Sequence, residues 1–263
     1  MRMSSEPVRI NSAVITRLLA VATAVLVAAS TSAVIMHRLV FPDSSLARKA
    51  MKLLYVELEL NIPAFFSAAL MAAAAMLFAL IFILERRKTG THSMEWGLLG
   101  LGFVAMAFDE LMSVHERLIE PVRALLGAGE LGILYFAWVV PGFILTLTLA
   151  GCFLRFYLRL PERTRYLTRL AAVMFLGGAL GLELAEGYHV EQFGKETAIY
   201  FLLTTFEETL EMAGLVVLIG ALVDYLSDHF STISLAFVSR PVPHVSTQGD
   251  RASLQDAVHA QWN

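Results

Sequence analysis

Residues 62–84 read IPAFFSAALMAAAAMLFALIFIL, a run of 23 residues that contains no charged side chain. A helix of about 20 apolar residues crosses the roughly 30 Å hydrocarbon core of a bilayer. In that core only a helix or a closed barrel satisfies its own backbone hydrogen bonds, and the run is far too long for one barrel strand. We therefore expect a transmembrane helix here.

Five further segments of the same character lie on either side of this run. They cover about residues 15–36, 96–115, 131–156, 167–187 and 199–226. The breaks between the segments contain Pro, Gly and charged residues, which typically end helices. The sequence thus predicts an all-α fold, a polytopic transmembrane bundle of about six helices that forms a single domain over residues 1–226.

The composition agrees with a chain whose main partner is the lipid bilayer. Hydrophobic residues make up 57% of the sequence and charged residues only 16%, whereas soluble domains contain about 25% charged residues. The net charge of -3 provides no basic field for nucleic acid. The single cysteine, Cys152, excludes an intramolecular disulfide framework and a Cys-based zinc cluster. The oligomeric state stays open.

The distribution of Lys and Arg predicts the orientation. With the N-terminus in the cytoplasm, 13 of the 20 basic residues lie on the cytoplasmic side, so both termini are expected there. The first span has an alternative interpretation as a cleavable signal peptide, because small residues follow its apolar core. Residues 41–61 are expected to form an amphipathic segment on the outer surface, and 227–263 a flexible cytoplasmic tail. Gly177 and Gly181 are spaced to let another helix approach closely.

Acidic and imidazole side chains are unusually frequent inside the predicted spans, where ionisable groups are functional candidates by default. The topology places those of the third, fifth and sixth spans in one outer half of the bundle. The candidates are Asp109, Glu110, His115, Glu116, Glu183, Glu186, His189, Glu207, Glu208 and Glu211. Possible supporting residues are Glu57, Asn61, Ser67 and Ser113.

Helical spacing arranges some of these candidates on common faces. In a continuous helix, Asp109, Ser113 and Glu116 lie on one stripe. Glu186 and His189 have the Glu-x-x-His spacing found in carboxylate-bridged metal sites of helical bundles. A divalent metal such as iron, manganese or zinc would suit oxygen and imidazole ligands.

Three functions remain open for this cluster. Each ionised acid at a helix centre costs roughly 2.5–3.5 kcal/mol, and no predicted span interior holds a Lys or Arg to offset it. The cluster therefore predicts the metal site of a membrane-embedded oxidoreductase or hydrolase that acts on a lipid-phase or small-molecule substrate. The alternatives are a proton- or cation-coupled transporter or channel, and a structural protein whose protonated carboxyls pack between helices.

Three stretches carry a resemblance to a known family. Residues 61–67 (NIPAFFS), the run from Asp109-Glu110 to His115-Glu116, and Glu207-Glu208-x-x-Glu211 resemble a family of bacterial multi-pass inner-membrane proteins of unknown function. The resemblance covers roughly residues 57–225. It implies the six-helix architecture and a bacterial inner-membrane location, and it marks these acids as the family's signature.

A more distant similarity is to membrane hydrolases of the alkaline ceramidase and adiponectin-receptor type. These enzymes combine an acid, a Ser, an Asp and several His around zinc, to which Ser67, Asp109 and His115 are loosely similar. The chain departs from their pattern because Glu208 and Glu211 stand where the His-x-x-x-His pair of the final helix is expected. That departure puts the zinc site in doubt.

Overall fold

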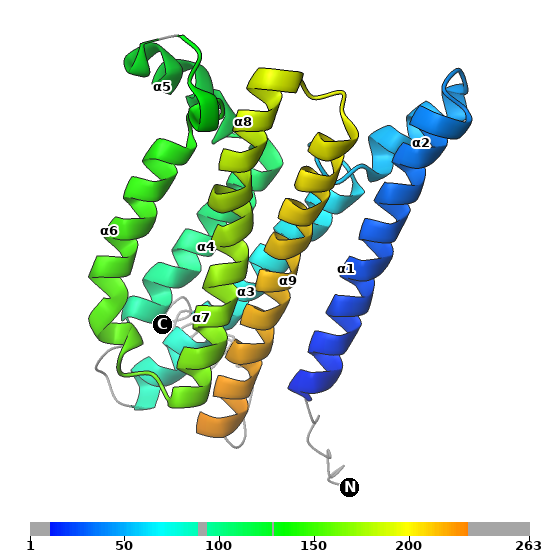
Figure 1. Cartoon of the computed structure of the whole chain (residues 1–263). Coiled ribbons are helices and arrows are strands. Elements are labelled where there is room, and N and C mark those ends of the chain that lie inside the picture. The colour runs from blue at the N-terminus through cyan, green and yellow to red at the C-terminus, as the bar shows by residue number, and fades with distance from the viewer. Residues whose placement is uncertain (1–10, 89–93, 128, 231–263) are drawn as a thin grey trace, which may run out of the picture. The chain divides into compact units, whose positions relative to one another are not determined.

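The computed structural model describes residues 11–88, 94–127 and 129–230, and over these residues the secondary structure is helical (Figure 1). The longer helices are α1 (Ser12–Ile35), α3 (Ile62–Lys88), α4 (Met94–Met112), α6 (Val139–Tyr157), α7 (Glu162–Leu176), α8 (Glu183–Phe193) and α9 (Ala198–His229). The shorter ones are α2 (Ser45–Leu54), α5 (Ile119–Leu126), two 3-10 turns (Glu116–Leu118 and Gly132–Leu134) and two π segments (Met36–Val40 and Gly177–Leu182). The prediction of an all-α helical bundle is confirmed.

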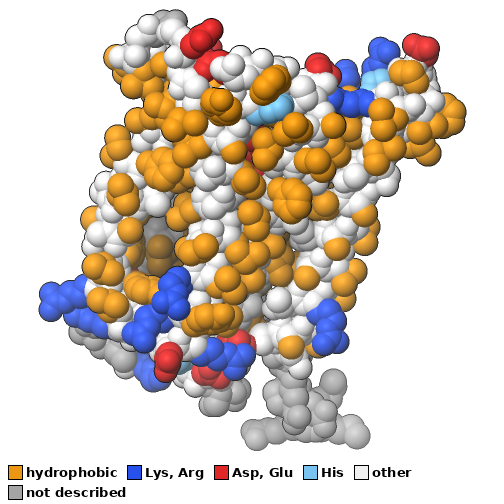
Figure 2. All heavy atoms as spheres, viewed as in Figure 1, with side chains coloured by type: hydrophobic (Ala, Val, Ile, Leu, Met, Phe, Trp, Pro, Cys, Tyr) orange, Lys and Arg blue, Asp and Glu red, His pale blue; other side chains and the backbone are white. Residues whose placement is uncertain are grey.

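Within the described ranges, five helices are long and apolar enough to cross a membrane. They are Ser12–Val40, Ile62–Lys88, Val139–Tyr157, Glu162–Phe193 and Ala198–His229. A sixth span results if α4 and the segment Glu116–Leu126 are counted together, although they are bent by 75°. Hydrophobic side chains cover the middle of the visible face, and Lys and Arg gather toward its ends (Figure 2). This distribution is typical of a membrane protein.

Helix α9 is the central element of the bundle. It packs against α1, α3, α7 and α8, and 67% of its apolar window is buried, compared with 11% for α6. Close packing depends on small residues: a Cβ added to Gly178 would lie 2.8 Å from the Glu207 carbonyl oxygen of α9. At Gly177 and Gly181, a Cβ would meet nothing within 4 Å. The close approach is thus made by Gly178, and the prediction for the Gly177/Gly181 pair is wrong.

Several helix boundaries differ from the predicted ones. Helix α4 ends at Met112 because Ser113 adopts a left-handed φ of 47°. The fourth predicted span becomes helical only at Val139, since turns and a 3-10 turn occupy most of residues 131–138. Within 41–61 the α-helix covers Ser45–Leu54. Helix α9 continues to His229, and residues 231–263 of the predicted tail lie outside the described residues.

Candidate functional site

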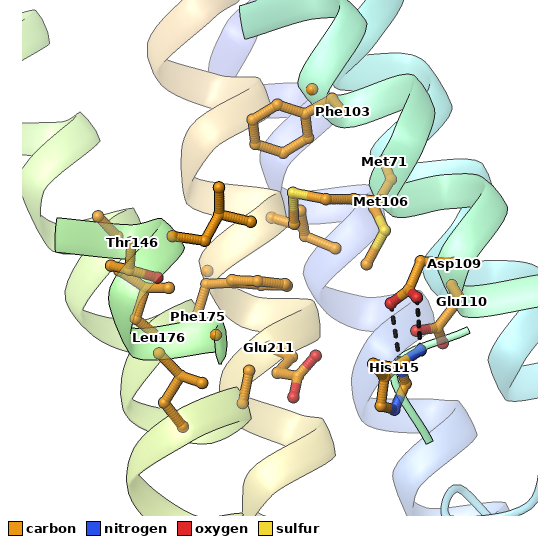
Figure 3. A pocket seen from close by; sticks show the side chains of 18 of the residues that line it. Met71, Phe103, Met106, Asp109, Glu110, His115, Thr146, Phe175, Leu176 and Glu211 are labelled. Carbon is orange, nitrogen blue, oxygen red and sulfur yellow. Dashed lines mark hydrogen bonds and ion pairs between the residues drawn. The ribbon is translucent and has the colours of Figure 1, made fainter. Parts of the chain in front are cut away.

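A cavity of about 1320 Å³ lies between α3, α4, α6, α7 and α9. Small-molecule sites usually enclose about 300–1,000 Å³, so this cavity has room for a large ligand. Apolar side chains such as Met71, Phe103, Met106 and Phe175 form much of its wall (Figure 3). Figure 2 also shows a hollow in the surface between α6 and the α7–α8 segment. Residues of α6 and of the α7–α8 segment also line the cavity.

Nearly all the predicted site residues line this one cavity. They are Asp109, Glu110, His115, Glu116, Glu183, Glu186, Glu207, Glu208 and Glu211, together with Glu57. Glu186 and Glu207 are 3% and 8% exposed, whereas Glu208 and Glu211 are partly buried and also line the cavity. The structure therefore brings together carboxyls from α4, α8 and α9 and from the segment before α3.

Asp109 and His115 form the best-defined polar pair in the wall. The Asp109 carboxyl accepts a hydrogen bond from the main-chain N–H of His115 at 2.9 Å, and its second oxygen lies 2.8 Å from His115 Nδ1. An ionised carboxylate can only accept, so the Nδ1 proton faces Asp109, and in the neutral imidazole Nε2 then carries the lone pair. This is the arrangement of a histidine that can act as a general base.

The turn at residues 113–115 creates this pair. In a continuous helix, positions 109 and 115 point about 120° apart and lie more than one turn from each other, so their side chains could not meet. The left-handed Ser113 breaks the helix and turns His115 back over the last turn of α4. The predicted stripe of Asp109, Ser113 and Glu116 is consequently interrupted. Strained positions of this kind often accompany functional sites.

A row of polar contacts extends from this pair to α9. The Trp138 ring lies 4.8 Å from the His115 ring, and Trp138 Nε1 donates a hydrogen bond to Glu183 Oε1 at 3.1 Å. Glu183 and Glu186 of α8 interact electrostatically with Glu207 of α9, so the row ends in three neighbouring carboxyls.

Glu57 is the centre of a second polar group. Tyr200 donates a hydrogen bond to Glu57 Oε1, Tyr55 donates one to Oε2 at 3.4 Å, and Lys195 Nζ lies 3.5 Å from Oε1. The Tyr55 hydroxyl also lies 3.3 Å from Thr204 Oγ1. The Lys195 ammonium therefore already has a carboxylate partner.

Two titratable groups outside the spans are perturbed by burial. Burial raises the pKa of the Glu59 carboxyl, although a hydrogen bond from Ser113 opposes the shift. Burial and the neighbouring Glu57 carboxylate raise the pKa of the Tyr55 phenol. Tyr55 thus stays a hydrogen-bond donor at physiological pH, and Glu59, which lines the cavity, is more easily protonated than an exposed glutamate.

Four predicted residues do not line the cavity. His189 Nε2 contacts Thr197 Oγ1 at 2.6 Å and its ring packs on Phe193, so the Glu186–His189 spacing does not form a shared site. Asn61 accepts the Ala64 N–H at the start of α3 and donates to the Tyr55 carbonyl, which is a structural role. Ser67 is buried in α3, and Ser113 forms the turn.

The geometry does not support the predicted metal centre. Among the residues that the structure describes, no three His, Cys, Asp or Glu side chains are grouped so that they could hold one ion. The carboxyls are instead spread along the cavity wall. The prediction of a metal-binding protein is therefore not supported by the arrangement of these side chains.

Trp138 and Tyr200 contact the carboxyls Glu183 and Glu57 but were not among the site residues predicted from the sequence. A signal for Tyr200 exists, because Tyr200, Thr204 and Glu207 recur at offsets of four and seven on one face of α9. No comparable signal existed for Trp138, since the segment before α6 is not regular helix.

Comparison with known protein families identifies the family of this chain. The family model described as Domain of unknown function (DUF8692) matches residues 18–226. The match begins within the first span, so it extends beyond the 57–225 region of the resemblance noted from the motifs. Searches of curated proteins and of solved structures found no significant match, and the ceramidase-type similarity is not among the findings. The chain belongs to the DUF8692 family.

Proposed function

We propose that this protein is a membrane-embedded hydrolase that binds a lipid-phase amphiphile in the cavity and uses His115 as the general base. The Asp109–His115 pair in the wall of a large apolar cavity is the observation that carries the proposal. We further propose the bacterial inner membrane as its location, supported by the distribution of basic residues and by the motif resemblance.

Each group of side chains in the cavity wall has its own role in the proposed reaction. The apolar wall binds the chain of the substrate, and the carboxyl row binds its head group. His115 Nε2 removes a proton from a water molecule, and Asp109 stabilises the resulting imidazolium. The Glu183–Glu207 pair holds a proton that can be given to the leaving group. The hollow between α6 and α7–α8 offers entry from the bilayer (Figure 2).

Turnover of membrane lipids tests this proposal. Purified protein is incubated with a bacterial lipid extract, and products are identified by mass spectrometry. We expect His115→Ala to abolish product formation and Asp109→Asn to lower it by about 10²–10⁴-fold, because the histidine loses its orientation and its counter-charge. His189→Ala is the matched control, since this histidine does not line the cavity. Equal turnover by wild type and His115→Ala contradicts the proposal.

The same turnover assay tests whether the activity depends on a divalent metal. Elemental analysis of the purified wild type is compared with turnover after chelation. Full activity in metal-free protein would contradict the predicted metal centre. Activity that rises in proportion to bound iron, manganese or zinc would contradict a base that works without metal.

Proton- or cation-coupled transport is a second candidate, and the continuous row of carboxyls favours it. The cavity is lined by Glu57 and Lys195, which are separate from α7, and by Arg169 of α7. Protons could pass along Glu186, Glu207 and Glu183. Liposomes with a trapped pH dye test this function. If the protein is a transporter, wild type should carry a proton or cation flux that Glu207→Gln abolishes. The absence of any flux under every imposed gradient would contradict transport.

A further inference from the structure

The buried carboxyl of Glu186 has an unused hydrogen-bonding position. Its side chain lines the cavity, the residue is only 3% exposed, and Oε1 has no hydrogen-bond partner. Leaving a buried polar atom without a hydrogen bond is unfavourable, and more so for a charged group. Such an atom indicates a donor that arrives with the ligand.

The charge of the cavity wall is strongly one-sided. Its acidic residues are Glu57, Glu59, Asp109, Glu110, Glu116, Glu183, Glu186, Glu207, Glu208 and Glu211. The Lys and Arg side chains in the same wall are Lys195, which is paired with Glu57, and Arg169. Within the described part of the chain, neither Glu186 nor the adjacent Glu183 and Glu207 forms an ion pair with Lys or Arg. A cationic group is what this wall lacks.

We propose that the head group of the bound amphiphile is a protonated amine, with its N–H donors directed at Glu186 Oε1 and the neighbouring carboxyls. The inference rests on the proposed function, because it names the substrate class of the same cavity. An ammonium group carries several donors on one charge, so it can bind carboxyls that are spread along a wall. A bare metal ion needs ligands that converge on one point, and the described residues provide no such group of three.

The other end of the ligand is fixed by the apolar wall. Met71, Met106, Phe175 and Leu176 line the same cavity as Glu211 (Figure 3). Burial of an alkyl chain against these side chains is favourable because it removes apolar surface from water. The apolar and the acidic side chains of the wall thus predict different contributions: burial of the alkyl chain supplies affinity, and the charge of the head group supplies selectivity.

Binding of dodecylamine and dodecanol separates these contributions. The full chain is placed in nanodiscs of neutral phosphatidylcholine, and binding is measured by native mass spectrometry against empty nanodiscs. At pH 7 we expect dodecylamine to bind at least about tenfold more tightly than dodecanol, because charge-assisted hydrogen bonds replace the missing partners. Glu186→Gln should reduce this preference at least several-fold and leave dodecanol binding unchanged.

Controls keep the result specific. Glu196→Gln removes an acid whose side chain is 88% exposed and does not line the cavity, so it should retain the preference. If Glu186→Gln does not fold, Glu110→Gln tests the same wall. Equal binding of amine and alcohol overturns the amine inference and leaves the cavity proposal standing. Binding of neither amphiphile contradicts both.

Discussion

At the scale of single residues, the site is organised by which carboxyls have partners. Asp109 receives two hydrogen bonds from His115, and Glu57 receives those of two tyrosines. Glu186 Oε1 and Glu59 Oε2 are buried atoms without a partner. The paired groups are therefore fixed in position, whereas the unpaired ones are available to a ligand or to a proton.

Glu59 gives a pH-dependent prediction. Burial raises the pKa of this carboxyl, so the native state favours its neutral form. The stabilising contribution of the neutral form is present below the ordinary pKa of a glutamate and is lost as the pH rises through the raised value. We expect Glu59→Gln to raise the melting temperature above that range and to change nothing at acidic pH. The gain is small because the side chain is only half-buried.

Thermal unfolding in detergent at several pH values checks this expectation. The exposed Glu196→Gln serves as the control for removing one negative charge. A stability difference between wild type and Glu59→Gln that is the same at every pH would show that the ionisation of Glu59 is not coupled to folding.

Residue patterns in the sequence predicted the acids of the cavity better than the histidines. Glu183, Glu186 and Glu207 could be placed in one half of the bundle because helix direction alone decides their depth. His115 and His189 depended on local geometry. The turn at Ser113 directs His115 to Asp109, while α8 continues past Gly187 and directs His189 to Thr197.

At the scale of secondary-structure elements, the contact between the α7–α8 segment and α9 positions the carboxyls. The π segment Gly177–Leu182 changes the helical register before Glu183, so that Glu183 and Glu186 both reach Glu207. Gly178 within this segment permits the close approach to the α9 backbone. Apolar run length predicts the existence of these helices, but it carries no information on a π segment.

Alanine substitutions at adjacent glycines test this contact. Gly178→Ala places a Cβ 2.8 Å from the Glu207 carbonyl oxygen, so we expect a loss of about 1–3 kcal/mol in stability and a lower melting temperature. Gly177→Ala meets nothing within 4 Å and should be neutral or slightly stabilising, since alanine favours helix. Equal melting temperatures for the two variants would mean that this contact does not hold the segment.

At the scale of the whole molecule, a buried helix and a peripheral helix enclose the cavity. Helix α9 is the most buried of the apolar spans, while α6 is largely exposed and still contributes Leu145, Leu149 and Phe153 to the cavity wall. Gly142 of α6 packs near Leu180, and Tyr157 donates a hydrogen bond to the Arg165 carbonyl at 3.2 Å. Between these two contacts, α6 faces the cavity. A sequence cannot predict such an internal space, because a cavity depends on how far helices stand apart.

Retention of an amphiphile by the purified protein tests most directly whether this cavity is a binding site. Gly102 lines the cavity and Gly151 of α6 does not, and a Cβ added to either meets nothing within 4 Å. Gly102→Phe should therefore place a ring at the cavity wall and reduce the space for a ligand, whereas Gly151→Phe adds the same side chain elsewhere. We expect solvent extraction and mass spectrometry to find an amphiphile retained by wild type and Gly151→Phe, and largely lost from a folded Gly102→Phe. Equal retention by all three proteins would contradict a ligand in the cavity.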